Sequence, residues 1–232
     1  MKLKIQLMKV LKTINGGNMN KATIERILGV LDDMFPDAKC ELNYTNKLEL
    51  LIAVMLSAQT TDASVNKLTK TLFQKYKNAY DYANAPIEEL ETDLRTIGLY
   101  RNKAKNVKAM CQTLISLHDG EVPCSHDLLT NLPGVGRKTA NVVMSEGFKV
   151  PFIAVDTHVE RISKRLKIAL KKDSVLEVEK KLMKRIPKER WIKTHHQLIF
   201  FGRYHCKAMN PDCEHCPLID ICSEPKRKKY LS

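Results

Sequence analysis

Residues 132–141 read Leu-Pro-Gly-Val-Gly-Arg-Lys-Thr-Ala-Asn, a glycine-rich turn between two segments with helical periodicity. Gly134 and Gly136 permit backbone angles that side chains forbid, so their N–H groups can point toward a phosphate at the start of the second helix. Lys138 stands at that helix start and is a candidate nucleophile. The same residues also fit a plain corner between two helices with a solvated lysine, and the turn by itself leaves both interpretations open.

The composition points to a polyanionic partner. The chain of 232 residues carries 39 lysines and arginines against 26 aspartates and glutamates, a net charge of +13. Such an excess favours a nucleic acid or an acidic membrane surface as partner. The longest apolar run, Leu48 to Leu56, is interrupted by Glu49 and is too short to cross a bilayer. We expect a cytoplasmic protein with no membrane partner, associated with the nucleoid if its source is bacterial.

Residues 1–18 form a separate N-terminal extension. The extension carries four lysines and no acidic residue, and it ends before a second methionine, Met19. Its apolar residues fall on one helical face, which predicts an accessory basic helix, and a true start at Met19 is the alternative. Lysines interrupt the apolar stretch, so a signal peptide is not expected.

Apolar residues recur with helical spacing along nearly the whole chain, and no stretch keeps the alternation of a strand. Residues 48–56 are apolar on almost every side, as in a buried central helix. Thr61 is the predicted cap of the next helix, and Gly147 is the predicted stop of the helix that follows the turn. Residues 152–155 predict a short extended segment that leads into a helix after Asp156. The expected fold class is all-α.

Four of the seven cysteines crowd together near the C-terminus, with six, two and five residues between successive members: Cys206, Cys213, Cys216 and Cys222. In a reducing cytoplasm such a cluster indicates a metal site and not disulfides. Zinc and an iron–sulfur cluster both accept four thiolates, and general frequency favours zinc. Cys111 falls on a helical core face, where a free cysteine packs as a small hydrophobe.

Several ordered motifs together resemble the endonuclease III family, DNA glycosylases of the helix-hairpin-helix superfamily. They are the turn at 132–141, Val-Asp-Thr-His at 155–158, the four-cysteine loop, Leu-Ser-Ala-Gln-Thr-Thr-Asp at 56–62, Ile-Gly-Leu-Tyr at 97–100 and Phe-Gly-Arg-Tyr at 201–204. The resemblance runs from about Met19 to Cys222.

The resemblance implies two all-α domains. A central helical domain, residues 40–150, would contain the helix-hairpin-helix, and an iron–sulfur domain would combine residues 19–39 with 151–232. The family's 4Fe-4S loop has the same cysteine spacing, so the resemblance implies that cofactor in place of zinc. Residues 207–212 hold one lysine and one aspartate, so a strongly basic phosphate contact is not expected in that loop.

The resemblance also implies how DNA would be held. A glycosylase must flip the damaged nucleotide out of the stack, and Gln59 and Leu99 are the residues that would fill the gap. Without the resemblance, a capping glutamine and a core leucine would be the preferred interpretation. Backbone N–H groups of Gly134 and Gly136 would hold a phosphate beside the lesion, with Arg137 and Thr139 as further DNA contacts.

The implied chemistry is covalent. A neutral amine at Lys138 would attack C1′, displace the base and leave a Schiff base, which allows β-elimination. Arg137 and burial against the groove wall would help the lysine to lose its proton. Asp156 would either take that proton or stabilise the cationic sugar, although an aspartate before Thr157 is also a good helix cap. His158 is expected to pack or hydrogen-bond near the site, and nothing marks His195 or His196 as metal ligands.

The implied function is a monomeric, bifunctional DNA glycosylase and AP lyase. It would excise oxidised pyrimidines in base excision repair and bind double-stranded DNA with damaged bases or abasic sites. The alternatives are an adenine-mismatch glycosylase, which shares the turn, the aspartate and the cluster but lacks the lysine, and a non-enzymatic DNA-binding module.

Overall fold

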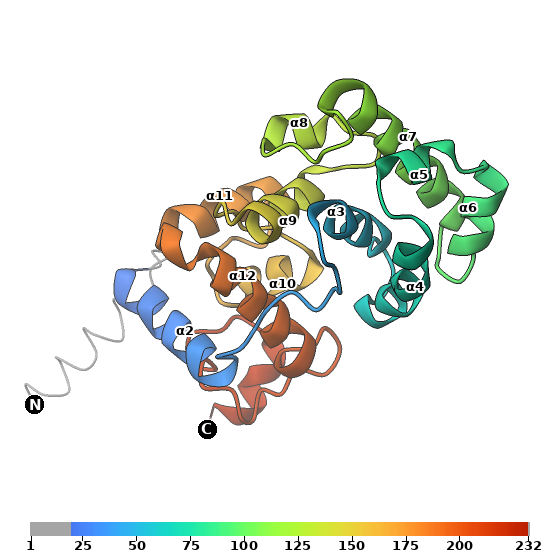
Figure 1. Cartoon of the computed structure of the whole chain (residues 1–232). Coiled ribbons are helices and arrows are strands. Elements are labelled where there is room, and N and C mark those ends of the chain that lie inside the picture. The colour runs from blue at the N-terminus through green and yellow to red at the C-terminus, as the bar shows by residue number, and fades with distance from the viewer. Residues whose placement is uncertain (1–19, 232) are drawn as a thin grey trace, which may run out of the picture.

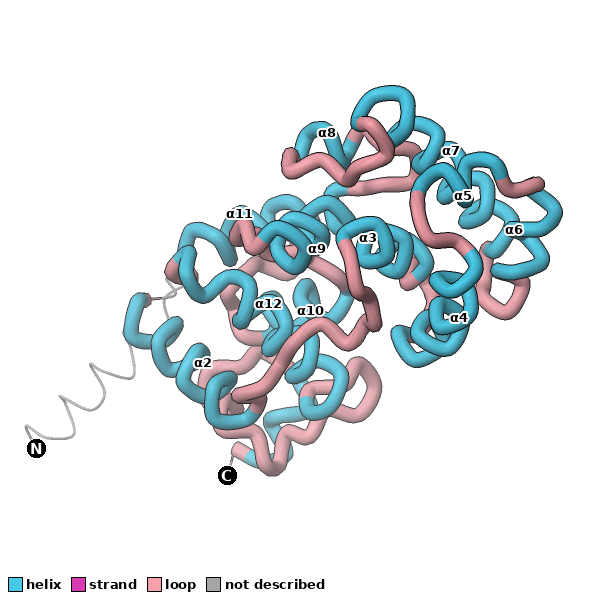
Figure 2. The backbone as a smooth tube through the Cα atoms, in the orientation of Figure 1, coloured by secondary structure: helices cyan, strands magenta, loops and turns pink. Residues whose placement is uncertain are grey.

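The computed structural model describes residues 20–231, so the predicted extension at 1–18 lies outside the described residues. Every regular element of the described part is helical, which confirms the all-α prediction (Figures 1 and 2). The α-helices are α2 (Lys21–Met34), α3 (Lys47–Leu56), α4 (Asp62–Lys75), α5 (Ala79–Asn84), α6 (Ile87–Leu94), α7 (Tyr100–His118), α8 (His126–Thr130), α9 (Arg137–Phe148), α10 (Thr157–Arg165), α11 (Val175–Arg185) and α12 (Trp191–Phe200). Short helical turns are η1 (Lys188–Arg190), η2 (Phe201–His205), which has π geometry, and η3 (Pro225–Tyr230).

Side chains at the helix starts explain where many of these helices begin. Thr61 accepts a hydrogen bond from the Ser64 N–H and caps α4, as predicted. Asn46, Ser125 and Ser174 cap α3, α8 and α11 in the same way. Each cap satisfies an N–H group that the helix itself leaves without an acceptor.

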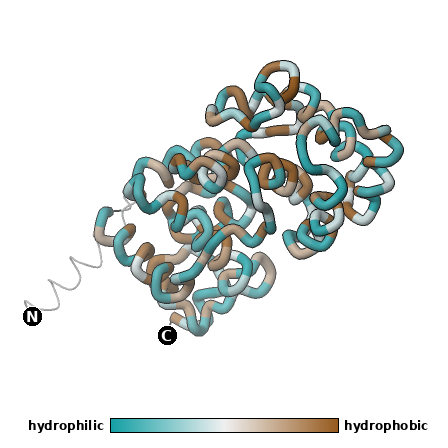
Figure 3. The backbone as a smooth tube through the Cα atoms, viewed as in Figure 1, coloured by the Kyte–Doolittle hydropathy of each residue, from teal (hydrophilic) through white to brown (hydrophobic). Residues whose placement is uncertain are grey.

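The first hydrophobic core forms around α3, whose residues Leu50 to Leu56 are all buried. Helices α4 to α9 supply the surrounding apolar side chains. Figure 3 shows the hydrophobic stretch of α3 inside this group of helices. The nearly uniform apolarity of this helix therefore follows from contact with neighbours on all sides.

The second core joins the two ends of the described chain. Helix α2 lies beside α12 (Figure 1), and Gln197 of α12 donates hydrogen bonds to the backbone carbonyls of Leu31 and Phe35. Apolar residues of α2, α10, α11, α12 and the C-terminal loop fill this core.

Residues 149–156, which have no regular secondary structure, run between the two cores. Phe152 packs against the first core and Ala154 is part of it, whereas Ile153 and Val155 belong to the second core. This alternation is the period of an extended backbone, in which successive side chains point to opposite sides. The segment therefore delivers Asp156 to the boundary between the cores.

Two expectations about glycine were wrong. Gly147 does not end its helix, because α9 continues to Phe148 and closes at Lys149, whose φ is +57°. A Cβ at position 147 would lie 3.2 Å from Leu50 Cδ2, so this glycine allows α9 to approach α3 closely. Gly136 has a φ of −88°, which any residue adopts, and only Gly134, with φ +75°, uses the freedom of glycine within the turn.

Candidate functional site

The glycine-rich turn is held by apolar anchors on either side of Gly134. Leu132 and Val135 are buried in the first core, while Gly134 lies exposed between them. A Cβ on Gly134 would come within 2.8 Å of Asn106 Cβ and 3.0 Å of Met55 Cε, so a side chain there is excluded by contact as well as by φ. Helix α9 then starts at Arg137 with no side-chain cap, because Gly136 has none to offer. The first turn of α9 is thus suited to an anion supplied from outside.

Lys138 and Asp156 line one cavity at the boundary between the two cores, which we call the central cavity. Residues 39–42, the end of α3, helix α9 and helix α12 form its walls. Lys138 is exposed on the first turn of α9, so the expected burial against a wall is not found. Residues separated by the whole α9 helix and the extended segment are therefore brought to one place.

Asp156 caps α10 and remains within reach of the central cavity. Its Oδ1 accepts hydrogen bonds from the His158 and Val159 N–H groups at 2.9 and 2.8 Å, and its Oδ2 lies 3.2 Å from His158 Nδ1. Burial alone would raise the pKa of Asp156, but the Val159 hydrogen bond and the His158 ring lower it overall. The capping role predicted for Asp156 is confirmed, and so is a hydrogen-bonding role for His158.

Two histidines on α12 also line the central cavity, and no local pattern in the sequence pointed to them. His195 is almost fully buried, and burial together with the neighbouring His196 lowers its pKa to about 3. His195 is therefore neutral at physiological pH. His196 Nε2 lies 2.7 Å from Glu146 Oε1, a contact that fixes its ring against α9. Burial would raise the pKa of Glu146, but the contact with His196 lowers it.

Gln59 and Leu99 both have the left-handed backbone conformation, with φ of +54° and +59°. Leu99 is 55% exposed, so the alternative of a core leucine is wrong. A Cβ on Gly98 would lie 4.0 Å from the Gln59 carbonyl oxygen, which places the two loops in contact. Both side chains are on exposed loops next to one another, as an inserting pair requires.

Lys103 of α7 connects these two loops, because its backbone N–H donates to the Leu99 carbonyl at 3.0 Å and its side chain reaches the loop that carries Gln59. Its ammonium donates to the Leu56 carbonyl at 2.9 Å and to Thr60 Oγ1 at 2.8 Å, although its side chain is largely buried. Burial lowers the pKa of Lys103. A lysine within a helical repeat is interpreted from sequence as a solvated residue, so this clamp could not have been foreseen.

Arg137 and Thr139, predicted DNA contacts, differ in their surroundings. Thr139 is partly buried at the start of α9. The Arg137 guanidinium donates to both carboxylate oxygens of Glu179 on α11, with Nε 3.1 Å from each. Arg137 is therefore held by another part of the protein and does not provide the free neighbouring charge that was expected beside Lys138.

The four C-terminal cysteines lie in the loop between η2 and η3. Cys206, Cys213 and Cys222 are buried and Cys216 is half-buried. Arg165 Nη1 lies 3.2 Å from Cys206 Sγ, and the Glu224 N–H lies 3.3 Å from Cys222 Sγ, so N–H donors already face two of the sulfurs. Over residues 20–231, no three His, Cys, Asp or Glu side chains converge closely enough to hold a metal ion.

The chemistry of this donor set nevertheless fits an iron–sulfur cluster. Four thiols without any disulfide lie in one short loop, and N–H donors directed at thiolate sulfur are a usual feature around such clusters. Arg165 also donates to the carbonyls of Lys207 and Ala208, which holds the backbone of the loop that starts at Cys206.

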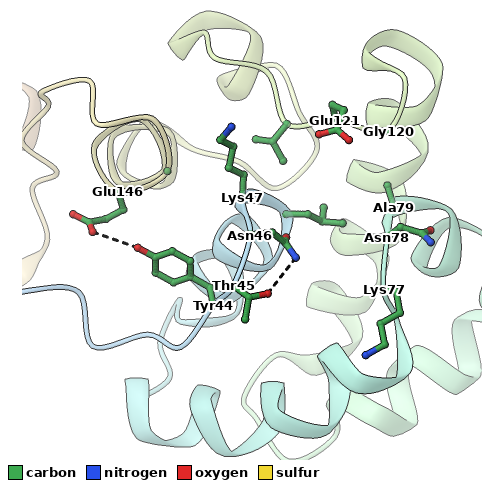
Figure 4. Close-up of a pocket in the computed structure, with 13 residues that line it drawn as sticks. Tyr44, Thr45, Asn46, Lys47, Lys77, Asn78, Ala79, Gly120, Glu121 and Glu146 are labelled. Carbon is green, nitrogen blue, oxygen red and sulfur yellow. Dashed lines mark hydrogen bonds between the residues drawn. The ribbon is translucent and has the colours of Figure 1, made fainter.

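A second cavity lies apart from these residues, beside the starts of α3 and α5 (Figure 4). Tyr44, Lys47 and Lys77 are among its lining residues, and Tyr44 Oη is 3.5 Å from Glu146 Oε2. None of the predicted catalytic, DNA-binding or metal-binding residues lines it.

Among the described helices, none has the length and apolarity needed to cross a membrane.

Comparison with protein families defines the class. Residues 52–188 match the HhH-GPD superfamily of base excision DNA repair proteins. A thermostable thymine-DNA glycosylase of known structure has the same fold, with a TM-score of 0.79 at 22% identity over 89% of this chain and 98% of the other. The fold and the glycine-rich turn are thus those of a helix-hairpin-helix DNA repair protein.

Closer relatives narrow the class further. Endonuclease III of Bacillus subtilis is 60% identical over 210 residues, which cover 90% of this chain and 96% of the relative. Endonuclease III of Escherichia coli K12 is 46% identical over 88% of this chain and 96% of its own length. The structure of a trapped endonuclease III–DNA covalent intermediate matches with a TM-score of 0.89 at 60% identity, covering 91% of this chain and 100% of the other. The chain belongs to the endonuclease III family.

Proposed function

We propose that this protein is a bifunctional DNA glycosylase and AP lyase that removes oxidised pyrimidines from double-stranded DNA. The observation that supports this most strongly is the shared position of Lys138 and Asp156 on the central cavity. A lysine nucleophile beside a carboxylate, on a helix whose first turn is free for a phosphate, provides both chemistry and DNA attachment. Endonuclease III relatives have been described in covalent and non-covalent complexes with DNA.

In the proposed reaction, Lys138 attacks C1′ in its neutral form. The bond between C1′ and the base nitrogen breaks, the electron pair leaves with the base, and the base takes up a proton. The lysine nitrogen, which now carries two protons, gives one of them up. Its electron pair then forms a double bond to C1′ as the C1′–O4′ bond breaks, O4′ takes up a proton, and a protonated Schiff base results. Loss of a C2′ proton then expels the 3′ phosphate, which cleaves the strand, and water releases the enzyme from the imine.

Asp156 could serve this scheme in either of two roles, and its contacts favour one of them. Burial raises its pKa, but the Val159 N–H group and the His158 ring lower the pKa overall and with it the basicity of the carboxylate. A weakly basic carboxylate is a poor proton acceptor but a fixed negative charge. We therefore assign Asp156 to the stabilisation of the cationic sugar in the transition state, with the lysine proton leaving by another route.

The DNA would be positioned by groups that read no sequence. The N–H groups at Gly134 and Gly136 would bind a phosphate, and Thr139 would lie next to the same phosphate. Gln59 and Leu99 would enter the stack from the two loops that Lys103 holds together.

The four cysteines would hold a 4Fe-4S cluster, which gains iron–thiolate bonds from Cys206, Cys213, Cys216 and Cys222 and fixes the C-terminal loop. The two cores support a division into a central helical domain and a cluster domain. We also propose that the protein acts as a monomer in the cytoplasm, at the nucleoid if its source is bacterial.

The test is trapping with borohydride. A duplex with one abasic site is incubated with the protein and sodium borohydride, which reduces an imine to a stable crosslink. We expect a crosslink with wild type and its loss in Lys138→Ala. A wild-type protein that forms no crosslink, or a variant that forms as much, would refute the lysine mechanism. Release of thymine glycol, compared with release of adenine opposite a mismatched base, tests the substrate class separately.

A further inference from the structure

Glu179 is a buried carboxylate that the proposed reaction does not use. It lies on α11, between the core residues Val178 and Leu182, and its side chain is only 3% exposed. A buried charge is stable only if hydrogen-bonding partners surround it. The residues that hydrogen-bond to Glu179 are therefore the ones whose positions it fixes.

Both partners of Glu179 belong to α9, the helix that carries Lys138. Arg137 directly precedes the lysine and donates from Nε and Nη2 to the carboxylate. Asn141, one turn later and fully buried, donates from Nδ2 to Glu179 Oε2 at 3.0 Å. A carboxylate bound at two successive turns fixes both the position and the rotation of the helix start.

Asn141 extends the network to the other reacting residue. Its Nδ2 also lies 3.1 Å from the carbonyl oxygen of Ile153, in the extended segment that ends at Asp156. One buried carboxylate thus touches the neighbour of Lys138 and, through a single amide, the segment that carries Asp156. Helices α9 and α11 otherwise contribute to different cores.

We infer that Glu179 is a positioning residue for the glycosylase–lyase reaction, which sets the geometry of Lys138 relative to Asp156 by binding Arg137 and Asn141. The inference rests on the proposed function. Glu179 does not line the central cavity, so it acts through these two residues and not on the DNA. Displacement of a reacting group by about 1 Å can slow a reaction by roughly 100-fold, so the expected effect is on rate and not on binding.

The experiment compares Glu179→Gln with the control Asp173→Asn. Asp173 lies just before α11, its side chain is also 3% exposed, and it pairs with Lys181 of α11, but it touches neither α9 nor the extended segment. Strand cleavage at an abasic site is followed under single turnover, which separates the rate constant from the fraction of active protein. Affinity is measured with a duplex that carries an uncleavable tetrahydrofuran site.

We expect Glu179→Gln to lower the rate constant about 10- to 100-fold at an unchanged active fraction. Affinity should change by less than about threefold, which is under 1 kcal/mol. Asp173→Asn should keep the wild-type rate constant. A purely structural role predicts the opposite pattern, a smaller active fraction that reacts at the normal rate, and that result would overturn the inference.

A second variant tests the inference independently, in case the Glu179→Gln protein does not fold. The Arg137 side chain is 49% exposed, so Arg137→Gln removes one branch of the network and leaves a hydrated surface. We expect a lower rate constant for this variant too, and combination with Glu179→Gln should cost less than the product of the two effects. Independent effects would contradict a shared network. Wild type that fails to cleave at all would instead refute the proposed function.

Discussion

Replacement of Asp156 by asparagine separates its charge from its role as a helix cap. The side-chain oxygen of the introduced asparagine can still accept from the His158 and Val159 N–H groups, as Asp156 Oδ1 does at 2.9 and 2.8 Å. Asparagine and aspartate cap helices about equally well, so we expect the free energy of unfolding to change by less than about 1 kcal/mol. The negative charge, however, is lost completely.

The size of the catalytic effect follows from that charge. A carboxylate about 4 Å from a cationic sugar, at an effective dielectric constant near 20, contributes about 4 kcal/mol. At about 1.4 kcal/mol for each factor of ten, Asp156→Asn should slow base release roughly 1,000-fold. Affinity for undamaged duplex should stay nearly constant, because backbone phosphate contacts do not involve this residue.

Single-turnover release of thymine glycol gives the rate, and thermal melting gives the stability. Asp156→Ala is the matched variant, since it removes charge and cap together and should lose about 1–2 kcal/mol of stability with the same slow chemistry. An Asp156→Asn protein that releases base within about tenfold of the wild-type rate, about 1.4 kcal/mol, would refute the electrostatic role. A large loss of stability in Asp156→Asn would contradict the cap geometry.

Three further predictions concern the turn, the inserting loop and acid stability. Gly134→Ala should destabilise the fold by about 2 kcal/mol or more, whereas Gly136→Ala should cost about 1 kcal/mol or less; equal losses of unfolding free energy in chemical denaturation would contradict the difference in φ. Leu99→Ala should leave the melting temperature unchanged and slow excision about tenfold from paired DNA but less from an unpaired lesion; an equal slowing on both would argue against insertion into the stack. Burial would raise the pKa of Asp32, but hydrogen bonds from Lys193 and Gln197 outweigh it and lower the pKa to about 2. Since the folded pKa is lowered, the carboxylate stabilises the protein fully above about pH 4, and this contribution disappears as the pH falls toward 2. Asp32→Asn should therefore lower the free energy of unfolding by about 1 kcal/mol at pH 7 and leave it unchanged near pH 2. The effect at pH 7 is small because the ion pair with Arg190 is partly exposed, and urea titrations at both pH values measure it.

Local signals in the sequence were sufficient to predict most of the helices and the capping role of Asp156 in the site. The caps at Thr61 and Asp156 could be predicted because each involves N–H groups only two or three residues away. Gly147 was misread because a glycine that ends a helix and a glycine that allows a close helix contact look the same in sequence. Only the position of Leu50 across the interface distinguishes them.

Residues that act over long sequence distances could not be identified in this way. Glu177 and Glu179 lie close together on one helix, yet Glu177 completes an exposed capping box and Glu179 binds α9 from a buried position. His195 lies on α12 and lines the central cavity together with Lys138, but no residue near it in the sequence indicates this shared position. In each case the informative contact is made with a part of the chain that the local pattern does not contain.

The pairing of α2 with α12 determines when the second core can be completed during synthesis. Gln197 and Leu31 are separated by 166 positions, so the N-terminal helix of the second core must wait for its partner. At roughly 5–20 residues per second, that wait is on the order of 10–30 seconds. The first core can meanwhile form around α3 and present Lys138, and Asp156 finds its N–H partners within α10, but the wall of the central cavity that α12 supplies is made only later. The central cavity is therefore complete only after α12 has been synthesised.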